Sequence, residues 1–138
     1  MRKLSGTIDG DLITRNFFPE YVGHEKGINS GNCFNWAYVA YRLYKNVQLW
    51  QNSAHAFVKQ NGKFYDSESP FGTNHYANLG CNTRCSWCCR NYRVSCAILV
   101  EHWYVDCRFY DRLIAIFWRK RNNKKLINRK NQQKQLAA

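Results

Sequence analysis

The fold of this chain is decided by three neighbouring stretches of sequence: GNCFNWAYVAYRLY (residues 31–44), SAHAFVKQ (53–60) and GKFYDSESPFG (62–72). They hold one cysteine at the start of an apolar-periodic segment, then one histidine and one aspartate in strand-like segments. The first stretch has apolar residues at steps of three and four, which predicts a helix with one buried face. Ser30, Gly31 and Asn32 are suited to cap its start, so Cys33 is predicted in the first turn.

Cys33 would gain a chemical role from that position. The free backbone N–H groups and the positive end of the helix dipole favour the thiolate over the thiol. The same N–H groups could bind the oxyanion that forms when a thiolate attacks a carbonyl. For Cys33 taken alone, the alternative interpretation is a buried structural cysteine, which is what most free cysteines are.

A β-hairpin is predicted to carry the histidine and the aspartate. Asn61-Gly62 separates two strand-like runs and favours a two-residue turn, which would pair Gln60 with Lys63. In that register His55 and Asp66 are diagonal neighbours on adjacent strands, within reach of a side-chain contact. Each also has a plainer interpretation, as a polar strand residue and as a turn cap. Together with the cysteine they predict a catalytic Cys–His–Asp arrangement.

These segments resemble the Cys–His–Asp core of the papain-like and transglutaminase-like cysteine hydrolases, over residues 31–72. In that superfamily the nucleophile opens a helix, and the His and the Asp or Asn follow on adjacent strands. The resemblance implies Cys33 as the nucleophile, His55 as general base and acid, and Asp66 as the residue that orients the imidazole. Papain-like enzymes usually carry a Gln upstream of the cysteine that lines the oxyanion hole. No Gln precedes the cysteine here, so Asn29 or Asn32 would have to take that place.

The length and the order of the predicted elements indicate one α+β domain. With 138 residues, 16% of them aromatic, the chain can bury one core. We expect the Cys33 helix to pack on a small antiparallel sheet built from residues near 54–68 and 95–105. A C-terminal helix is predicted over residues 108–121, so that the domain spans residues 1–121.

The N-terminal segment lacks the apolar stretch of a signal peptide. No apolar run approaches the roughly 18 residues that a membrane-spanning helix needs. We therefore expect a cytoplasmic protein without a transmembrane segment. Its predicted catalytic arrangement needs no cofactor and would act on a protein or peptide substrate.

A Cys-rich segment at residues 81–107 holds six of the seven cysteines. Without a secretory signal, such thiols are more often free, metal-bound or catalytic than paired in disulfides. One interpretation is a structural zinc site. Its candidate ligands are Cys81, Cys85, Cys88 and Cys96, with Cys89, His75, His102 and Cys107 as substitutes. Buried free thiols, disulfides and an iron–sulfur site are the alternatives.

The iron–sulfur alternative comes from the spacing C-x3-C-x2-C, which resembles the cluster motif of radical S-adenosylmethionine enzymes. That family builds a large βα barrel after the motif. Only 50 residues follow Cys88 here, which is too few for such a barrel and for the closed shell that the cluster needs.

The C-terminal segment carries most of the net charge. From residue 108 onward there are 10 Lys or Arg against one acidic residue, a surplus of 9 within the net charge of +12. Periodicity is lost after Trp118, so residues 122–138 are predicted to be a basic, mobile tail. Such a tail binds phosphates through counterion release, and an aromatic residue beside it could stack on a base. The candidate nucleic-acid contacts are Trp118, Arg119, Lys120 and Arg121. A solubilising tail, or weak binding to any anionic surface such as lipid headgroups, is the alternative.

Two functions are therefore predicted. The first is a cysteine hydrolase of the peptidase, amidase or isopeptidase type, acting on an amide or thioester bond through Cys33, His55 and Asp66. The second is a Cys-rich, metal-stapled module that binds nucleic acid through its basic tail and has no catalysis. The two are not exclusive, because a catalytic domain can carry both a zinc site and a basic tail.

Overall fold

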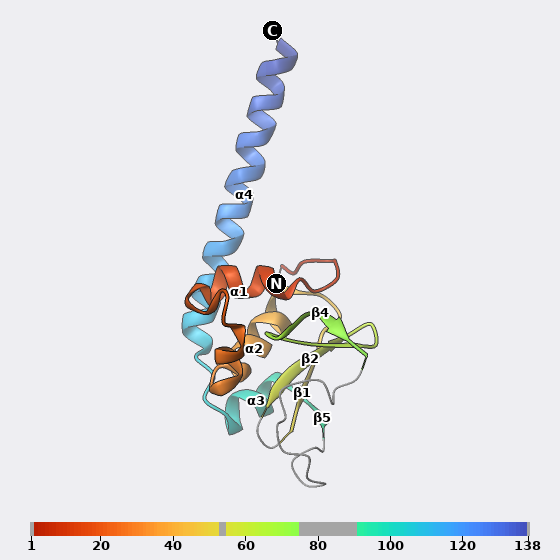
Figure 1. The fold of residues 1–138 in the computed structure, drawn as a ribbon. Coiled ribbons are helices and arrows are strands. Elements are labelled where there is room, and N and C mark those ends of the chain that lie inside the picture. The colour runs from red at the N-terminus through yellow and green to blue at the C-terminus, as the bar shows by residue number, and fades with distance from the viewer. Residues whose placement is uncertain (1, 53–54, 75–90, 138) are drawn as a thin grey trace.

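The computed structural model describes residues 2–52, 55–74 and 91–137. These residues form the predicted α+β fold, in which helices pack against an antiparallel sheet with strand order β4-β3-β2-β1-β5 (Figure 1). The helices are α1 (Gly10–Phe17), α2 (Cys33–Leu43), α3 (Cys96–His102) and α4 (Cys107–Ala137), with short 3-10 helices η1 (Pro19–Tyr21) and η2 (Glu25–Ser30). The strands are β1 (Gln48–Gln51), β2 (Ala56–Gln60), β3 (Lys63–Asp66), β4 (Ser69–Thr73) and β5 (Tyr92–Val94).

The predicted hairpin is formed by β2 and β3. Gln60 pairs with Lys63, as expected from a two-residue turn. Asn61 and Gly62 have φ angles of 49° and 80°, the positive values that a type I′ hairpin turn requires at both positions. This turn sets the register of the hairpin. In that register His55 and Asp66 both lie toward its open end, away from the turn.

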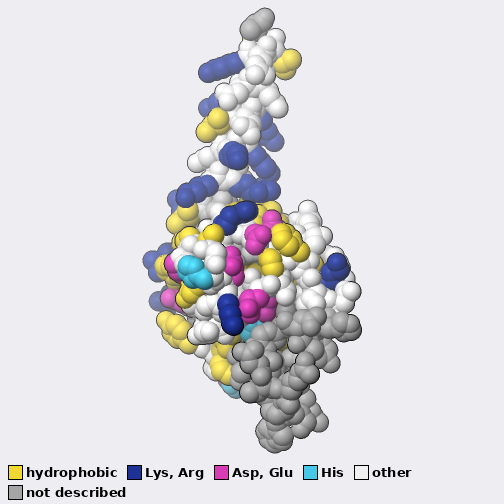
Figure 2. Space-filling model, in the orientation of Figure 1, with side chains coloured by type: hydrophobic (Ala, Val, Ile, Leu, Met, Phe, Trp, Pro, Cys, Tyr) yellow, Lys and Arg dark blue, Asp and Glu magenta, His cyan; other side chains and the backbone are white. Residues whose placement is uncertain are grey.

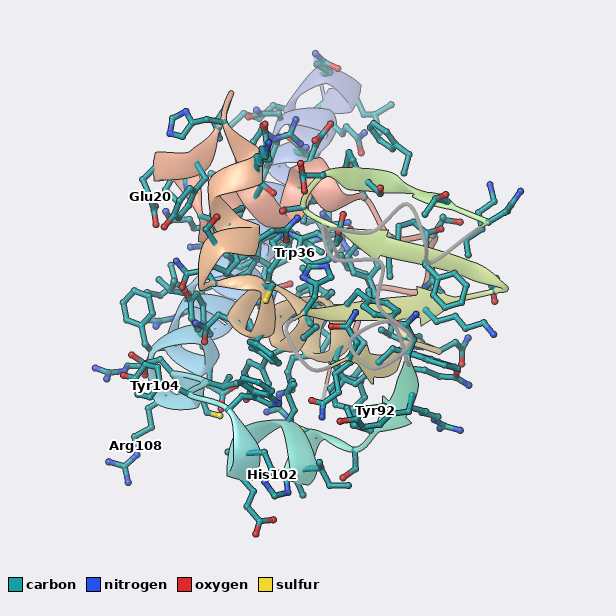
Figure 3. All side chains as sticks on the ribbon, turned by 60° about the horizontal axis from the view of Figure 1, so that its bottom comes forward. Glu20, Trp36, Tyr92, His102, Tyr104 and Arg108 are labelled. Atoms are coloured by element: carbon teal, nitrogen blue, oxygen red, sulfur yellow. The ribbon has the colours of Figure 1, made fainter. Side chains whose placement is uncertain are left out.

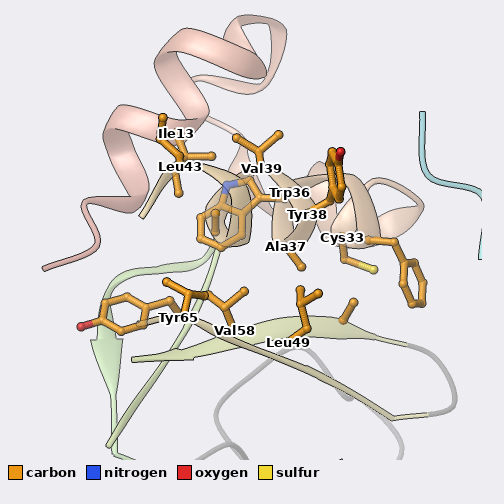
Figure 4. Close-up of a cluster of buried hydrophobic side chains, with 14 of the residues drawn as sticks. Ile13, Cys33, Trp36, Ala37, Tyr38, Val39, Leu43, Leu49, Val58 and Tyr65 are labelled. Atoms are coloured by element: carbon orange, nitrogen blue, oxygen red, sulfur yellow. The ribbon is translucent and has the colours of Figure 1, made fainter. Parts of the chain in front are cut away.

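The main core lies between α2 and the sheet. Figure 4 shows Trp36 of α2 between Ile13 of α1 and the sheet residues Val58 and Tyr65. All four side chains are at most 2% exposed, and burial of each large apolar side chain stabilises the fold by about 1.5–3 kcal/mol. The Trp36 indole Nε1–H donates to the Thr14 hydroxyl oxygen at 3.3 Å, which ties α2 to α1. The core therefore fixes the position of α2, and of its first residue, relative to the sheet.

The predicted strand over residues 95–105 is wrong. β5 ends at Val94 and the chain enters α3, where only Leu99 is buried. The Ser95 side chain accepts a hydrogen bond from the backbone N–H of Ile98, which is an N-cap and starts the helix. The apolar run within residues 95–105 has no periodicity that distinguishes a strand from a short helix. The N-cap at Ser95 therefore favours the helix.

The C-terminal helix is longer than predicted. α4 continues through Ala137, so the segment predicted as a tail after residue 121 is helical. Every residue from 119 to 137 is exposed, and a helix with no face to bury needs no apolar periodicity. Lys, Arg and Gln are good helix formers, which accounts for the helix. The mobility of this segment stays a prediction. In the part of the chain that the structure describes, no helix is both long and apolar enough to span a bilayer.

Gly10 provides a test of the packing of α1 against β4. A Cβ atom at Gly10 would lie 2.5 Å from Pro70 Cα and 2.9 Å from the Pro70 carbonyl oxygen. A Gly→Ala change in a helix ordinarily stabilises it by up to about 1 kcal/mol. Because this contact is with backbone, we expect Gly10→Ala to lower the free energy of unfolding by about 1–3 kcal/mol, as measured by urea denaturation.

The control is Gly6→Ala, whose new Cβ would meet nothing within 4 Å. It should leave the free energy of unfolding nearly unchanged. Stabilisation by Gly10→Ala would show that α1 does not approach β4 as closely as the structure has it.

Candidate active site

Cys33 is the first residue of α2, as predicted, and is 3% exposed. Its side chain lies on the side of the helix that faces the sheet (Figure 4). Gly31, with a φ of 140°, turns the chain from η2 into α2, a conformation that residues with a Cβ rarely adopt. Asn32 occupies the N-cap position, but its side chain makes no capping hydrogen bond. The N–H groups of the first turn are therefore not occupied by a side-chain cap and can serve a substrate oxygen.

His55 and Asp66 are in contact, which confirms the predicted diagonal pair. The distance from His55 Nε2 to Asp66 Oδ2 is 3.0 Å, and both side chains are 2% exposed. Cys33 is the other neighbour that raises the pKa of His55, which places the thiol beside the imidazole. Because Nε2 faces the carboxylate, Nδ1 is the ring nitrogen left for the thiol. The structure thus brings the three predicted residues together, with His55 in the middle.

Asp66 is held by the turn that follows β3. Its Oδ1 accepts hydrogen bonds from the backbone N–H groups of Glu68 and Ser69, at 3.0 and 2.8 Å. The turn-cap interpretation of Asp66 is therefore correct as well, and it is compatible with the contact to His55. With Oδ1 bound by the backbone, the carboxylate has a fixed orientation that points Oδ2 at the imidazole.

His55 is held by Asn52, a residue that the sequence analysis missed. The His55 backbone N–H donates to Asn52 Oδ1 at 2.8 Å, and the Asn52 N–H donates to the His55 carbonyl at 2.9 Å. Asn52 Nδ2 in turn donates to Asn91 Oδ1 at 3.1 Å, next to β5. No local pattern marks Asn52 in the sequence. Its role follows only from the way that the ends of β1, β2 and β5 meet.

The pKa of His55 is raised to about 9. Burial is the largest single influence and lowers the pKa of His55, but it is outweighed by the hydrogen bond to Asp66, by the neighbouring Cys33 and by the negative charge of the carboxylate. The imidazole therefore carries a proton at neutral pH. An imidazolium between a thiol and a carboxylate is the arrangement that stabilises a thiolate nucleophile.

The two asparagines predicted to serve an oxyanion lie in different places. Asn29 Nδ2 donates to Glu68 Oε2 at 2.6 Å and lies 3.5 Å from Asp66 Oδ2, so Asn29 is on the carboxylate side of the site. Asn32 adjoins Cys33 in the chain, and its Nδ2 donates to the Tyr21 hydroxyl at 2.9 Å. A role for either in binding an oxyanion stays a prediction, and Asn32 is the nearer to the nucleophile in sequence.

The predicted zinc ligands fall mostly outside the described residues. This applies to Cys81, Cys85 and Cys88 and to the substitutes His75 and Cys89. The remaining candidates are Cys96, Cys107 and His102. Burial, and then the neighbouring Cys107, raise the pKa of the Cys96 thiol, while His102 is exposed on α3 (Figure 3). Within residues 2–52, 55–74 and 91–137, no three His, Cys, Asp or Glu side chains are grouped so as to hold a metal. Zinc therefore stays a prediction.

The raised pKa of His55 predicts how stability depends on pH. An unfolded histidine loses its proton near pH 6.5, whereas His55 in the folded protein keeps it to about pH 9. The stabilisation is therefore fully present below about pH 6.5 and is lost as the pH rises through about 9. Denaturant unfolding at a series of pH values should show a decline on the order of 3 kcal/mol over this range.

Asp66→Asn is the matched variant, because it preserves the shape of the side chain and removes its charge. The pKa of His55, followed by NMR of the imidazole, should fall in this variant, and the decline in stability should become smaller. A His55 titration midpoint near 6.5 in the wild-type protein would contradict the buried contact with the carboxylate.

No protein-family model matches this chain, and searches of curated proteins and of solved structures find no significant match. The resemblance to papain-like hydrolases therefore rests on residues 31–72 of the sequence alone. The chemistry of the site has to be inferred from its own geometry and charge.

Proposed function

We propose that this protein is a cysteine hydrolase of the papain-like type, which cleaves an amide or thioester bond in a protein or peptide. The observation that carries the proposal is the position of His55, which lies 3.0 Å from the carboxylate of Asp66 and close enough to Cys33 for the thiol to raise its pKa. Cys33 also opens a helix, where backbone N–H groups can bind a developing oxyanion. A structural cysteine needs neither of these features.

The proposed reaction follows from the order of the three residues. In the reactive form the proton of the Cys33 thiol already resides on His55, and the thiolate attacks the substrate carbonyl to form a carbon–sulfur bond. The oxyanion lies against the N–H groups at the start of α2. When the carbonyl reforms, the bond to the leaving amine or thiol breaks, and His55 gives its proton to that group. A water molecule, deprotonated by His55, then hydrolyses the acyl-enzyme thioester and releases Cys33.

Asp66 supports both halves of this reaction. It stabilises the charged imidazole and, by occupying Nε2, leaves Nδ1 as the ring nitrogen available to Cys33. The near-complete burial of both side chains strengthens this interaction, because few water molecules screen it. An amine acceptor in place of water would convert the same intermediate to a transamidation product, so the acceptor decides between hydrolysis and transfer.

The second predicted function, a metal-stapled nucleic-acid module without catalysis, rests on cysteines that lie mostly outside the described residues. Its cationic part does not depend on those cysteines, because the cations lie on α4.

Thiol reactivity tests the proposal. Cys33 is 3% exposed, whereas Cys96 and Cys107 are partly exposed, so exposure alone predicts that Cys33 reacts last with a small reagent such as iodoacetamide. We expect the opposite order, because His55 favours the thiolate of Cys33. Mass spectrometry of the alkylated peptides measures all three rates in one sample. In His55→Ala the rate at Cys33 should fall tenfold or more, and the rates at Cys96 and Cys107 should not change. Reaction of Cys33 last, with or without His55, would rule out an activated nucleophile.

Substitutions should separate the three roles in turnover of a panel of small peptide amides and thioesters. Cys33→Ala and His55→Ala should each abolish turnover, because the nucleophile and the base cannot be replaced. Asp66→Ala should reduce turnover less, since it removes only the group that orients the base. Cys96→Ala is the control and should remain active. Full activity of Cys33→Ala would contradict the proposal.

A further inference from the structure

We propose that the exposed end of α4, residues 119–137, binds duplex DNA along its major groove. We call this segment the cationic arm. It extends away from the rest of the chain, and Figure 2 shows Lys and Arg side chains along it. Every residue of the arm is exposed, and none is Asp or Glu. Its cations are Arg119, Lys120, Arg121, Lys124, Lys125, Arg129, Lys130 and Lys134.

The direction of the arm is fixed at its base. The Arg2 guanidinium lies over the Trp118 ring, 4.4 Å from its centroid, and donates to Asn122 Oδ1 at 2.6 Å. The rings of Phe17 and Phe117, from α1 and α4, have centroids 5.8 Å apart. These contacts join the start of the arm to the N-terminus and to α1. Trp118 is thereby engaged with Arg2, and we assign it an anchoring role rather than stacking on a base.

The cations are distributed around the whole helix. Successive residues of a helix are rotated by about 100°, so positions 119, 120 and 121 alone point in three widely separated directions. The apolar residues of the arm, Leu126, Ile127 and Leu136, form no stripe. A helix that lies on a membrane needs one apolar face, and a helix in a coiled coil needs an apolar seam. The arm has neither, and this argues against a lipid surface or a second copy of the chain as its partner.

A groove with phosphates on both sides fits this distribution. A helix is about 10–12 Å wide with its side chains, and the major groove of B-DNA is about 12 Å wide. Cations on opposite sides of the arm would each face a phosphate strand. Amide side chains lie between the cations, and amides pair with the edge of adenine. They are Asn122, Asn123, Asn128, Asn131, Gln132, Gln133 and Gln135.

The positive surface of the arm continues into a groove beside α1. A groove of about 380 Å³ lies between α1 and α4, and no acidic residue lines it. Its cations are Arg15, Lys120, Arg121 and Lys124. Arg15 belongs to α1, so the groove extends the positive surface from the arm to the body of the protein. A DNA backbone that leaves the arm would meet this groove next.

Fluorescence anisotropy of the full chain with a short labelled DNA duplex tests the proposal. The arm variant replaces Lys124, Lys125, Arg129 and Lys130 by Gln, which keeps helix propensity and changes only exposed residues. We expect binding to weaken tenfold or more at about 0.15 M salt. The slope of log K against log salt should become shallower by about 3–4, as the loss of four phosphate contacts requires. Circular dichroism checks that α4 is retained.

The control variant removes the same charge elsewhere. It replaces Lys26, Lys63, Arg93 and Arg108 by Gln, all exposed outside the arm; Arg108 points away from the body in Figure 3. Its affinity for the duplex should stay within about twofold of the wild type. Equal losses in both variants would mean that net charge alone acts, and would overturn the proposal. Tighter binding to single-stranded DNA or to phosphatidylserine vesicles than to the duplex, or no binding to the duplex, would also overturn it.

The proposal for the active site and the proposal for DNA binding can be tested independently of each other. Cys33→Ala should bind the duplex as tightly as the wild type, and the arm variant should keep the thiol reactivity of Cys33. Loss of one property in the variant made for the other would show that the arm and the candidate active site are coupled.

Discussion

The buried hydrogen bond between His55 and Asp66 is the constraint on which the candidate site depends. Both side chains are 2% exposed, and a buried charge without a partner costs several kcal/mol. The two strands of the hairpin must therefore stay in the register that joins them. The neighbouring polar groups follow from the same requirement, since Asn52 holds the backbone of His55 and the turn after β3 holds Asp66. A slip of β3 by one residue against β2 would place His55 and Asp66 on opposite faces of the sheet.

The core supplies the third member of the site. Trp36 and its apolar neighbours fix α2 on the sheet, and the left-handed conformation of Gly31 fixes where α2 begins. Cys33 therefore reaches His55 because a helix start and a strand end are placed together by packing that is otherwise unrelated to the chemistry. This division explains why Cys33→Ser should leave the fold intact, since a hydroxyl is close in size to a thiol and the apolar contacts of α2 remain.

The parts that could be predicted from the sequence are those specified by local chemistry. Asn61-Gly62 defines one turn, that turn defines one register, and the register brings His55 to Asp66. The helix that begins at Cys33 follows from its apolar spacing. α3 could not be predicted in this way, because its apolar run suits a strand equally well and the Ser95 cap decided the outcome. The role of Asn52 could not be predicted, because it depends on strand ends that meet only in three dimensions. The helical end of α4 could not be predicted either, because an exposed helix has no buried face and so shows no apolar periodicity.

The central claim is that Cys33 is a nucleophile served by His55, and trapping the covalent intermediate tests it most directly. The protein is mixed with a small activated ester, quenched at short times and analysed by mass spectrometry of its peptides. We expect an acyl group on Cys33 that forms and is then lost by hydrolysis. Both steps should be slowed in His55→Ala, and Cys33→Ala should carry no acyl group at this position. Acyl groups on Cys96, Cys107 or surface lysines, with none on Cys33, would contradict it.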